Sequence, residues 1–205
     1  MDDRLPRSFY ARSALSVAPD LLGRVLVRML PDGSRLAARI VEAEAYLPRD
    51  PASHAFNGMT RRNAVMFGPP GHLYVYFTYG NHWMMNAVTG RDGEGTAVLL
   101  RAAEPLAGLE AMTARRGRDD PRELCSGPGK IAQAFGVTRD QNGEDLVRGE
   151  VVWVERGRAS QRRPVAKGIR VGVSVGHDKP WRFWEEGSPF VSRGRPGPPS
   201  PKRRR

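Results

Sequence analysis

The chain has 205 residues, of which 40% are apolar and 27% are charged, a length and composition that suit one globular domain and leave little room for two. Its 33 Lys and Arg residues exceed its 22 Asp and Glu residues, and the formal charge of +11 favours a polyanionic partner, either nucleic acid or a membrane surface. The single cysteine, Cys125, excludes an intramolecular disulfide, a cysteine-rich zinc site and an iron–sulfur cluster, so we expect a reducing, intracellular setting.

The N-terminal part of the chain predicts a helix and a pair of strands. A helix is expected over residues 12–23, and the alternation of arginine with apolar residues over 24–30 is typical of a strand. Turn residues at 31–33 (PDG) lead into a second strand over 36–47.

The strand over 36–47 carries two acidic residues on one face. A period of two places Ile40, Glu42, Glu44 and Tyr46 together. A carboxylate among apolar neighbours on an internal strand is desolvated and can serve as a general base, and Glu44 is the leading candidate. The alternative for either acid is a structural ion pair with an arginine such as Arg39.

A loop and a short helix are expected after this strand. Residues 48–59 show no regular apolar period, and Thr60 is placed to cap a helix over 61–67. His54 lies in the loop, where a polar aromatic side chain can bind a sugar, a phosphate or a base. The four histidines form no H-E-x-x-H pattern, so we expect no metal site.

A β-hairpin is the clearest element of the sequence. Strands are expected over 72–79 (HLYVYFTY) and 82–88, joined by a tight turn at Gly80-Asn81. Tyr79 would lie beside the hairpin tip and Tyr76 further down the same strand. Aromatic residues so placed suit stacking against bases, although strand tyrosines also simply pack in cores.

The next segments offer two basic candidates. A buried strand over 97–105 carries Arg101, which would hold its guanidinium near the interior and require an anionic partner such as Glu44. A helix follows over 108–117. The segment SGPGK then begins another helix; it lacks the glycine and the Ser or Thr of a nucleotide-binding loop, but Lys130 could contact a DNA phosphate, or the segment could be a plain helix start.

The C-terminal part predicts short strands and a tail. Strands are expected over 151–157, 167–176 and 180–187. The stretch 193–205 carries six basic residues and no acidic ones, and its Pro, Gly and Ser content cannot bury enough apolar surface to fold. We therefore predict a folded body over 1–192 and a disordered basic arm over 193–205.

No membrane segment is expected. The N-terminus lacks the basic start and apolar core of a signal peptide, and no run of about 18 apolar residues is present. A long amphipathic segment with a basic face is also missing, which favours nucleic acid over a membrane as the partner. We expect a cytoplasmic protein.

Several segments, taken together and in this order, resemble the alkyladenine (3-methyladenine) DNA glycosylase family in its bacterial form. They run from about residue 8 to 192 and comprise RIVEAEAYL, ASH, TRRNAVMFGPPGHLYVYFTYGNH, MMN, AVLLRAAEP, ELCSGPGK, RVGV and GSPFVS. The resemblance implies a mixed α/β (α+β) single domain with a curved antiparallel sheet, a protruding β-hairpin and surrounding helices. It also implies a monofunctional enzyme of base excision repair that flips alkylated or deaminated purines out of duplex DNA and hydrolyses their N-glycosidic bond.

The resemblance assigns catalytic roles to three positions. Glu44 matches the general base that activates the water. Arg101 matches the arginine that helps to hold this water, and the backbone carbonyl of Val171 matches its third contact.

The resemblance assigns binding roles to five more positions. Tyr46, His54 and Tyr76 match the walls of the base pocket, and Asn86 matches a residue that excludes undamaged guanine by a clash with its exocyclic amine. Tyr79 matches the side chain that intercalates into the gap left by the flipped nucleotide.

The sequence departs from the family pattern at a few places. Met84 replaces a common cysteine, Asn81 replaces a common methionine, and the loop from Tyr46 to His54 is shorter than in some members. These departures bear on the range of damaged bases and not on the reaction.

Two other classes of function remain open at this point. A non-catalytic, basic nucleic-acid-binding module would leave Glu44 structural. An RNA- or nucleoside-directed N-glycoside hydrolase would need no duplex, and Tyr79 at the hairpin tip argues against it. We expect no cofactor and no metal, a monomer, and a nucleoid-associated protein whose partner is duplex DNA containing damaged purines.

Overall fold

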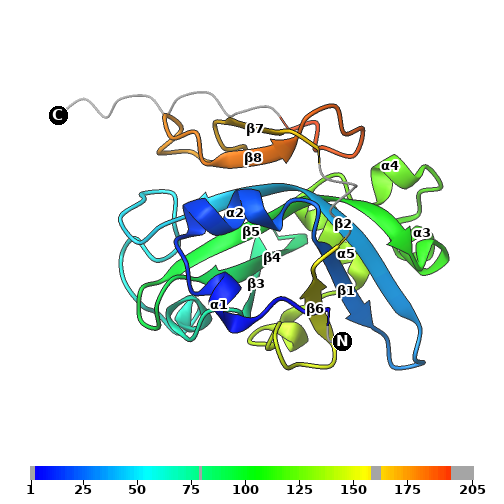
Figure 1. The fold of residues 1–205 in the computed structure, drawn as a ribbon, viewed down its shortest axis with the longest axis horizontal. Helices are drawn as coiled ribbons and strands as arrows, with labels where there is room; N and C mark the ends of the chain where they lie inside the picture. Colours follow the sequence, from blue (N-terminus) through cyan, green and yellow to red (C-terminus); the bar gives the residue numbers. More distant parts are fainter. Residues whose placement is uncertain (1–2, 79, 158–162, 195–205) are drawn as a thin grey trace.

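A computed structural model describes residues 3–78, 80–157 and 163–194, which form a curled antiparallel sheet flanked by helices (Figure 1). Its strands are β1 (Val25–Met29), β2 (Arg35–Tyr46), β3 (Leu73–Thr78), β4 (His82–Thr89), β5 (Thr96–Ala107), β6 (Val152–Glu155), β7 (Val165–Gly168) and β8 (Arg182–Glu185). Its α-helices are α1 (Arg7–Tyr10), α2 (Ala14–Leu21), α3 (Leu109–Arg116), α4 (Pro121–Leu124) and α5 (Pro128–Phe135), and its 3-10 helices are η1 (Ala64–Phe67) and η2 (Arg139–Gln141).

The two long strands β2 and β5 form the centre of the sheet. The strand order is β3-β4-β5-β2-β1-β6, and every pair is antiparallel. Beyond the end of β1, the free edge of β2 pairs with β8, which in turn pairs with β7 and brings the C-terminal part of the chain over the sheet (Figure 1). The predicted α+β fold with a curved antiparallel sheet and a β-hairpin is confirmed.

The sheet separates a main core from a second face. Strand alternation sends Ala45, Val75, Met85 and Leu100 into the main core, where side chains of α2 and α5 also lie. The residues between them point to the opposite face, which is covered by loops rather than by the main core. This second face carries most of the residues that the sequence marks for chemistry.

A double irregularity in the central strand pair changes this alternation. Ile40 pairs with Ala103 and Glu42 with Ala102, so Val41 is an extra residue in β2, and the register then skips Arg101 in β5. A bulge of this kind bends a strand and re-aims its side chains. Ile40 therefore lies in the main core, and its predicted place on the face of Glu42 is wrong.

Other local predictions need smaller corrections. The strand expected over 167–176 is wrong beyond its first two residues, because β7 ends at Gly168 and residues 169–176 form a loop. The helix expected over 61–67 is only the 3-10 turn η1, which begins after Asn63 and not after Thr60. The Thr60 hydroxyl accepts from the Asn63 N–H (3.4 Å) and donates to the Asn63 side chain (2.9 Å). Among the described residues, no helix is both long and apolar enough to cross a membrane.

Candidate active site

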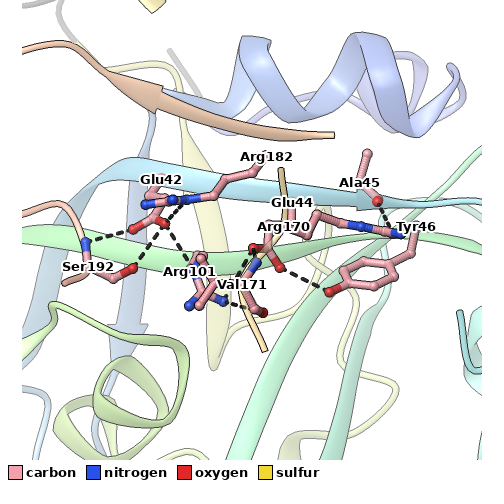
Figure 2. A network of polar contacts seen from close by, with 9 residues as sticks. All are labelled: Glu42, Glu44, Ala45, Tyr46, Arg101, Arg170, Val171, Arg182 and Ser192. Carbon is pink, nitrogen blue, oxygen red and sulfur yellow. Dashed lines mark hydrogen bonds and ion pairs between the residues drawn. The ribbon is translucent and has the colours of Figure 1, made fainter. Parts of the chain in front are cut away.

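Glu44 is buried near the C-terminal end of β2 and is held by three neighbouring groups. The Tyr46 hydroxyl donates to its Oε2 (2.9 Å), the backbone N–H of Val171 donates to its Oε1 (2.8 Å), and Arg101 Nη1 lies 3.4 Å from Oε1. The exposed fraction of Glu44 is 0%. Figure 2 shows these groups converging from β2, β5 and the loop after β7. Three chain segments thus meet at one carboxylate.

Burial sets the protonation behaviour of Glu44. Desolvation raises the pKa of this carboxyl, and the Arg101 charge, the Val171 N–H and the Tyr46 hydroxyl oppose the rise only in part. A carboxyl whose pKa moves toward neutrality is a better general base than an ordinary surface glutamate. Burial also raises the pKa of the Tyr46 hydroxyl, which therefore stays protonated and donates.

The raised pKa makes a prediction about stability. Because the folded pKa of Glu44 lies above its unfolded value, the stability linked to this group is fully present below the unfolded pKa and is lost as pH rises through the folded pKa. Glu44→Gln removes the titration, so its Tm relative to wild type should increase as pH rises from about 5 to about 8. Thermal unfolding of both proteins checks this, and a Tm difference independent of pH would contradict it.

A cavity of about 380 Å³ opens directly in front of Glu44. Tyr46, Arg101 and Val171, the three residues that contact Glu44, belong to its wall. The wall also contains residues from η1, β3, β4, β5, the start of α5 and two loops: Pro51, Ala52, Ser53, His54, Met66, Tyr74, Tyr76, Thr78, Met84, Asn86, Leu99, Pro128, Gly172, Val173, Ser174 and Val175. The volume suits a small aromatic molecule.

One wall of the cavity is aromatic. The His54 and Tyr76 rings lie with their centroids 4.4 Å apart, the Tyr74 and Tyr76 centroids are 5.4 Å apart, and His54 Nδ1 is 3.0 Å from the Tyr74 hydroxyl. Burial and the nearby Arg62 charge lower the pKa of His54, which favours its neutral form. Such a wall can stack a planar ring and offers one imidazole for hydrogen bonding.

Asn86 stands on β4 between β3 and β5. Its side-chain amide donates to the Tyr74 carbonyl oxygen (3.2 Å), and its exposed fraction is 4%. The hydrogen bond fixes the side chain at the cavity wall, where it can discriminate between ligands by shape.

A buried ion pair joins the two loops that line the cavity. Arg170 and Asp50 are both fully buried; Arg170 Nη2 donates to Asp50 Oδ1 (3.0 Å), and Nη1 donates to Asp50 Oδ2 and to the Ala45 carbonyl oxygen. The guanidinium also lies over the Tyr46 ring, 4.6 Å from its centroid. Gly176 closes the same loop with φ +64°, and a side chain there would meet both Asp50 and Arg170. The pair therefore positions Tyr46 and Val171.

Comparison with known families shows which family the chain belongs to. A family model described as methylpurine-DNA glycosylase matches residues 8–189. The chain belongs to the methylpurine-DNA glycosylase family. It is accordingly a DNA glycosylase, a hydrolase of DNA repair, and this assignment argues against the non-catalytic binding module.

Curated relatives agree with the family. The chain is 46% identical to a protein of Carboxydothermus hydrogenoformans, with 92% of this chain and 98% of the relative covered. It is 49% identical to one of Methanoculleus marisnigri (92% and 98% covered) and 50% identical to one of Burkholderia cenocepacia (92% and 90% covered). Each carries the name "Putative 3-methyladenine DNA glycosylase".

The glycosylase fold brings most of the predicted site residues together. Glu44 lies directly behind the cavity. Six further predicted residues lie in the cavity wall: Tyr46, His54, Tyr76, Asn86, Arg101 and Val171. Val171 contributes more than its predicted carbonyl, because its N–H donates to Glu44 while its carbonyl accepts from Arg101 Nη1 (3.5 Å).

Two predicted residues stand apart from this group. Lys130 lies in α5, where its Nζ donates to the Ser126 hydroxyl (3.2 Å), and its contact with a DNA phosphate stays a prediction. Tyr79 lies outside the described residues, as does 195–205 of the predicted tail. No group of three or more His, Cys, Asp and Glu side chains that could hold a metal occurs in the described part of the chain.

Sequence reasoning missed several residues of this glycosylase site. Tyr74 shares its strand face with Tyr76, so the period of two in β3 was a usable signal for it. The Asp50–Arg170 pair joins residues 120 positions apart, so no local sequence pattern predicts it. Glu42 and Glu44 do form the ion pairs with arginine that the sequence left open, but through Arg101 and, for Glu42, Arg182. The example arginine was wrong, since Arg39 binds Glu104 and Glu185.

Proposed function

We propose that this glycosylase excises alkylated or deaminated purines from duplex DNA by water that Glu44 activates. The substrates are 3-methyladenine, 7-methylguanine, ethenoadenine and hypoxanthine. The observation that carries the proposal is a buried carboxylate with a raised pKa, held by Arg101 and Val171 directly behind an aromatic cavity of nucleobase size.

The aromatic wall supports recognition of a flipped base. The glycosidic bond is shielded in a stacked duplex, so the damaged nucleotide must rotate out of the helix into the cavity. Tyr46, His54 and Tyr76 line the space that it would enter. Cationic bases such as 7-methylguanine gain from electron-rich rings, and neutral hypoxanthine requires protonation before it leaves. Tyr79 fills the gap left in the duplex.

The carboxylate and its partners account for the bond cleavage. The bond between C1′ and the base nitrogen breaks, and its electron pair leaves with the base. The resulting sugar cation is stabilised by the negative charge of Glu44. Water, oriented by Arg101 and the Val171 carbonyl, forms the new bond to C1′, and its proton passes to Glu44. The products are a free base and an abasic site.

The lining also supports a monofunctional reaction. No lysine belongs to the described cavity wall, so no amine there could form a Schiff base with the sugar and cut the strand. We therefore propose that the DNA strand stays intact. The experiment is single-turnover excision from duplexes that carry one lesion each, with analysis of strand continuity before and after heating in alkali, which cleaves abasic sites. RNA and free nucleosides in parallel reactions test the rival hydrolase.

Asn86 makes a prediction about specificity. Hypoxanthine and guanine differ at the exocyclic amine, and we propose that the fixed Asn86 side chain clashes with this group. Asn86→Ala opens the space, so the rate of guanine excision relative to hypoxanthine excision should rise about 10- to 100-fold. Free guanine released from undamaged duplex measures this. An unchanged ratio would show that Asn86 does not select against the amine.

A further inference from the structure

Arg101 lies between two buried carboxylates. Its Nε is 2.9 Å from Glu42 Oε1, and its Nη1 is 3.4 Å from Glu44 Oε1 (Figure 2). The exposed fraction of both glutamates is 0%, whereas Arg101 reaches the cavity wall. The closer contact of the guanidinium is thus with Glu42, to which the proposed reaction gives no role.

Glu42 is held more firmly than Glu44. Arg182 Nε donates to its Oε1 (2.6 Å), and Ser192 donates to it twice, from its N–H to Oε2 (2.7 Å) and from its hydroxyl to Oε1 (3.0 Å). These donors come from β8, which lies beside β2 as its antiparallel neighbour, and from the segment that follows β8 (Figure 1). Several donors therefore fix the Glu42 carboxylate in place.

The C-terminal segment also restricts Arg101 directly. A Cβ on Gly194 would lie 2.6 Å from Val171 Cγ1 and 3.0 Å from Arg101 Nη2, so the backbone at this position packs closely on both residues. Arg101 is itself the residue skipped by the register between β2 and β5, and the irregular pairing aims its side chain between the two acids. Its position depends on Glu42, Ser192 and Gly194.

Two carboxylates share the single positive charge of Arg101. A guanidinium beside a single carboxylate normally forms a bidentate pair, which occupies both oxygens. Glu42 competes for Arg101, and Glu44 keeps only the longer contact at 3.4 Å. Glu44 Oε1 accepts one short hydrogen bond, from the Val171 N–H at 2.8 Å, and because a carboxylate oxygen has two acceptor sites, one remains for a water.

We propose that Glu42 is a positioning residue that holds the Arg101 guanidinium away from a closed pair with Glu44 and thereby leaves the Glu44 carboxylate available to the attacking water. This inference rests on the proposed role of Glu44. It adds a residue that touches neither the cavity nor the reacting atoms. The C-terminal segment acts through the same carboxylate.

The test uses Glu42→Gln, which keeps the size of the side chain and removes its charge. In this variant Arg101 turns to Glu44, so the plateau rate of single-turnover excision falls about 100-fold. The acidic limb of the pH–rate profile moves about one pH unit lower, because Glu44 loses a like charge and gains a closer cation. The other charged and titratable groups near Glu44 are unchanged in this variant; they are Tyr46, Arg170 and Arg182.

Two variants separate positioning from stability. Glu185→Gln breaks a comparable buried ion pair, between Glu185 on β8 and Arg39 on β2. It should lower Tm similarly and leave the acidic limb of the pH–rate profile unchanged. Glu42→Asp restores the charge and should return the limb toward its wild-type position. If the acidic limb of the pH–rate profile shifts in Glu42→Gln and in neither of the other two variants, the inference is supported. If the limb lies at the same pH in wild type and all three variants, the inference is overturned.

A substrate-free measurement keeps this test distinct from that of the proposed function. Carbon-13 NMR of glutamate side chains, with the Glu44 signal assigned by its loss in Glu44→Gln, follows the Glu44 titration directly. A lower Glu44 pKa in Glu42→Gln supports the inference even if excision fails, and an unchanged pKa overturns it. Failure of wild type to excise any lesion would instead overturn the proposed function.

Discussion

Glu44→Gln should lower the single-turnover rate of base excision about 1,000-fold, because a positioned general base contributes about 100- to 10,000-fold. The amide keeps the shape of the side chain. Its oxygen can accept from the Val171 N–H and its NH2 can donate to the Tyr46 hydroxyl oxygen, so the fold around it should survive. It cannot take the proton of the water or offer a full negative charge to the sugar cation. Quenched-flow or manual single-turnover kinetics on a duplex with one hypoxanthine measure the loss.

DNA binding decides how this loss is interpreted. Because Glu44 lies behind the cavity wall and is fully buried, the affinity of Glu44→Gln for lesion-containing duplex should stay within a few-fold of wild type. Glu185→Gln, which alters a buried carboxylate away from the cavity, should retain excision. If Glu44→Gln excised at the wild-type rate, Glu44 would not be the base.

Asp50→Ala should destabilise the fold by about 3–5 kcal/mol, because it leaves the buried Arg170 guanidinium without its carboxylate partner. The Asp50–Arg170 pair joins the loop that carries His54 to the loop that carries Val171, so the cavity wall should also loosen. Denaturation in guanidinium chloride gives the free energy of unfolding, and excision should fall in parallel.

A surface pair and a double variant provide controls for Asp50. Arg12 and Asp20 form an exposed ion pair at 2.8 Å, and Asp20→Ala should cost less than about 1 kcal/mol. Asp50→Ala combined with Arg170→Met should cost less than the sum of the two single changes, since no unpaired charge remains. A loss below about 1 kcal/mol for Asp50→Ala would show that the pair does not hold the loops.

Period-two patterns predicted most of the sheet. The strands over 24–30, 36–47, 72–79, 82–88 and 97–105 match β1 to β5 within two residues at either end. One face of each of these strands packs in the main core, so burial requires apolar and other residues to alternate along the strand. The family motif then placed its residues on neighbouring strands, and the structure gathers them at one cavity.

Contacts between distant segments lay beyond sequence reasoning. The irregular pairing at Val41 and Arg101 involves two strands at once, so neither segment shows it, and the face assignment of Ile40 failed there. The segment 169–176 has the valine content of a strand. It forms a loop because Arg170 pairs with Asp50 and because Gly172 has a φ of +75°, which a strand does not allow. The Glu42 contacts with Arg182 and Ser192 span 140 and 150 positions.

Excision by water that Glu44 activates is tested most directly by incubating wild-type protein in excess with a duplex that carries one hypoxanthine and identifying both products. We expect free hypoxanthine together with a continuous strand that breaks only after heating in alkali, in an amount that Glu44→Gln greatly reduces. No released base, or a strand already cut before alkali, would contradict it.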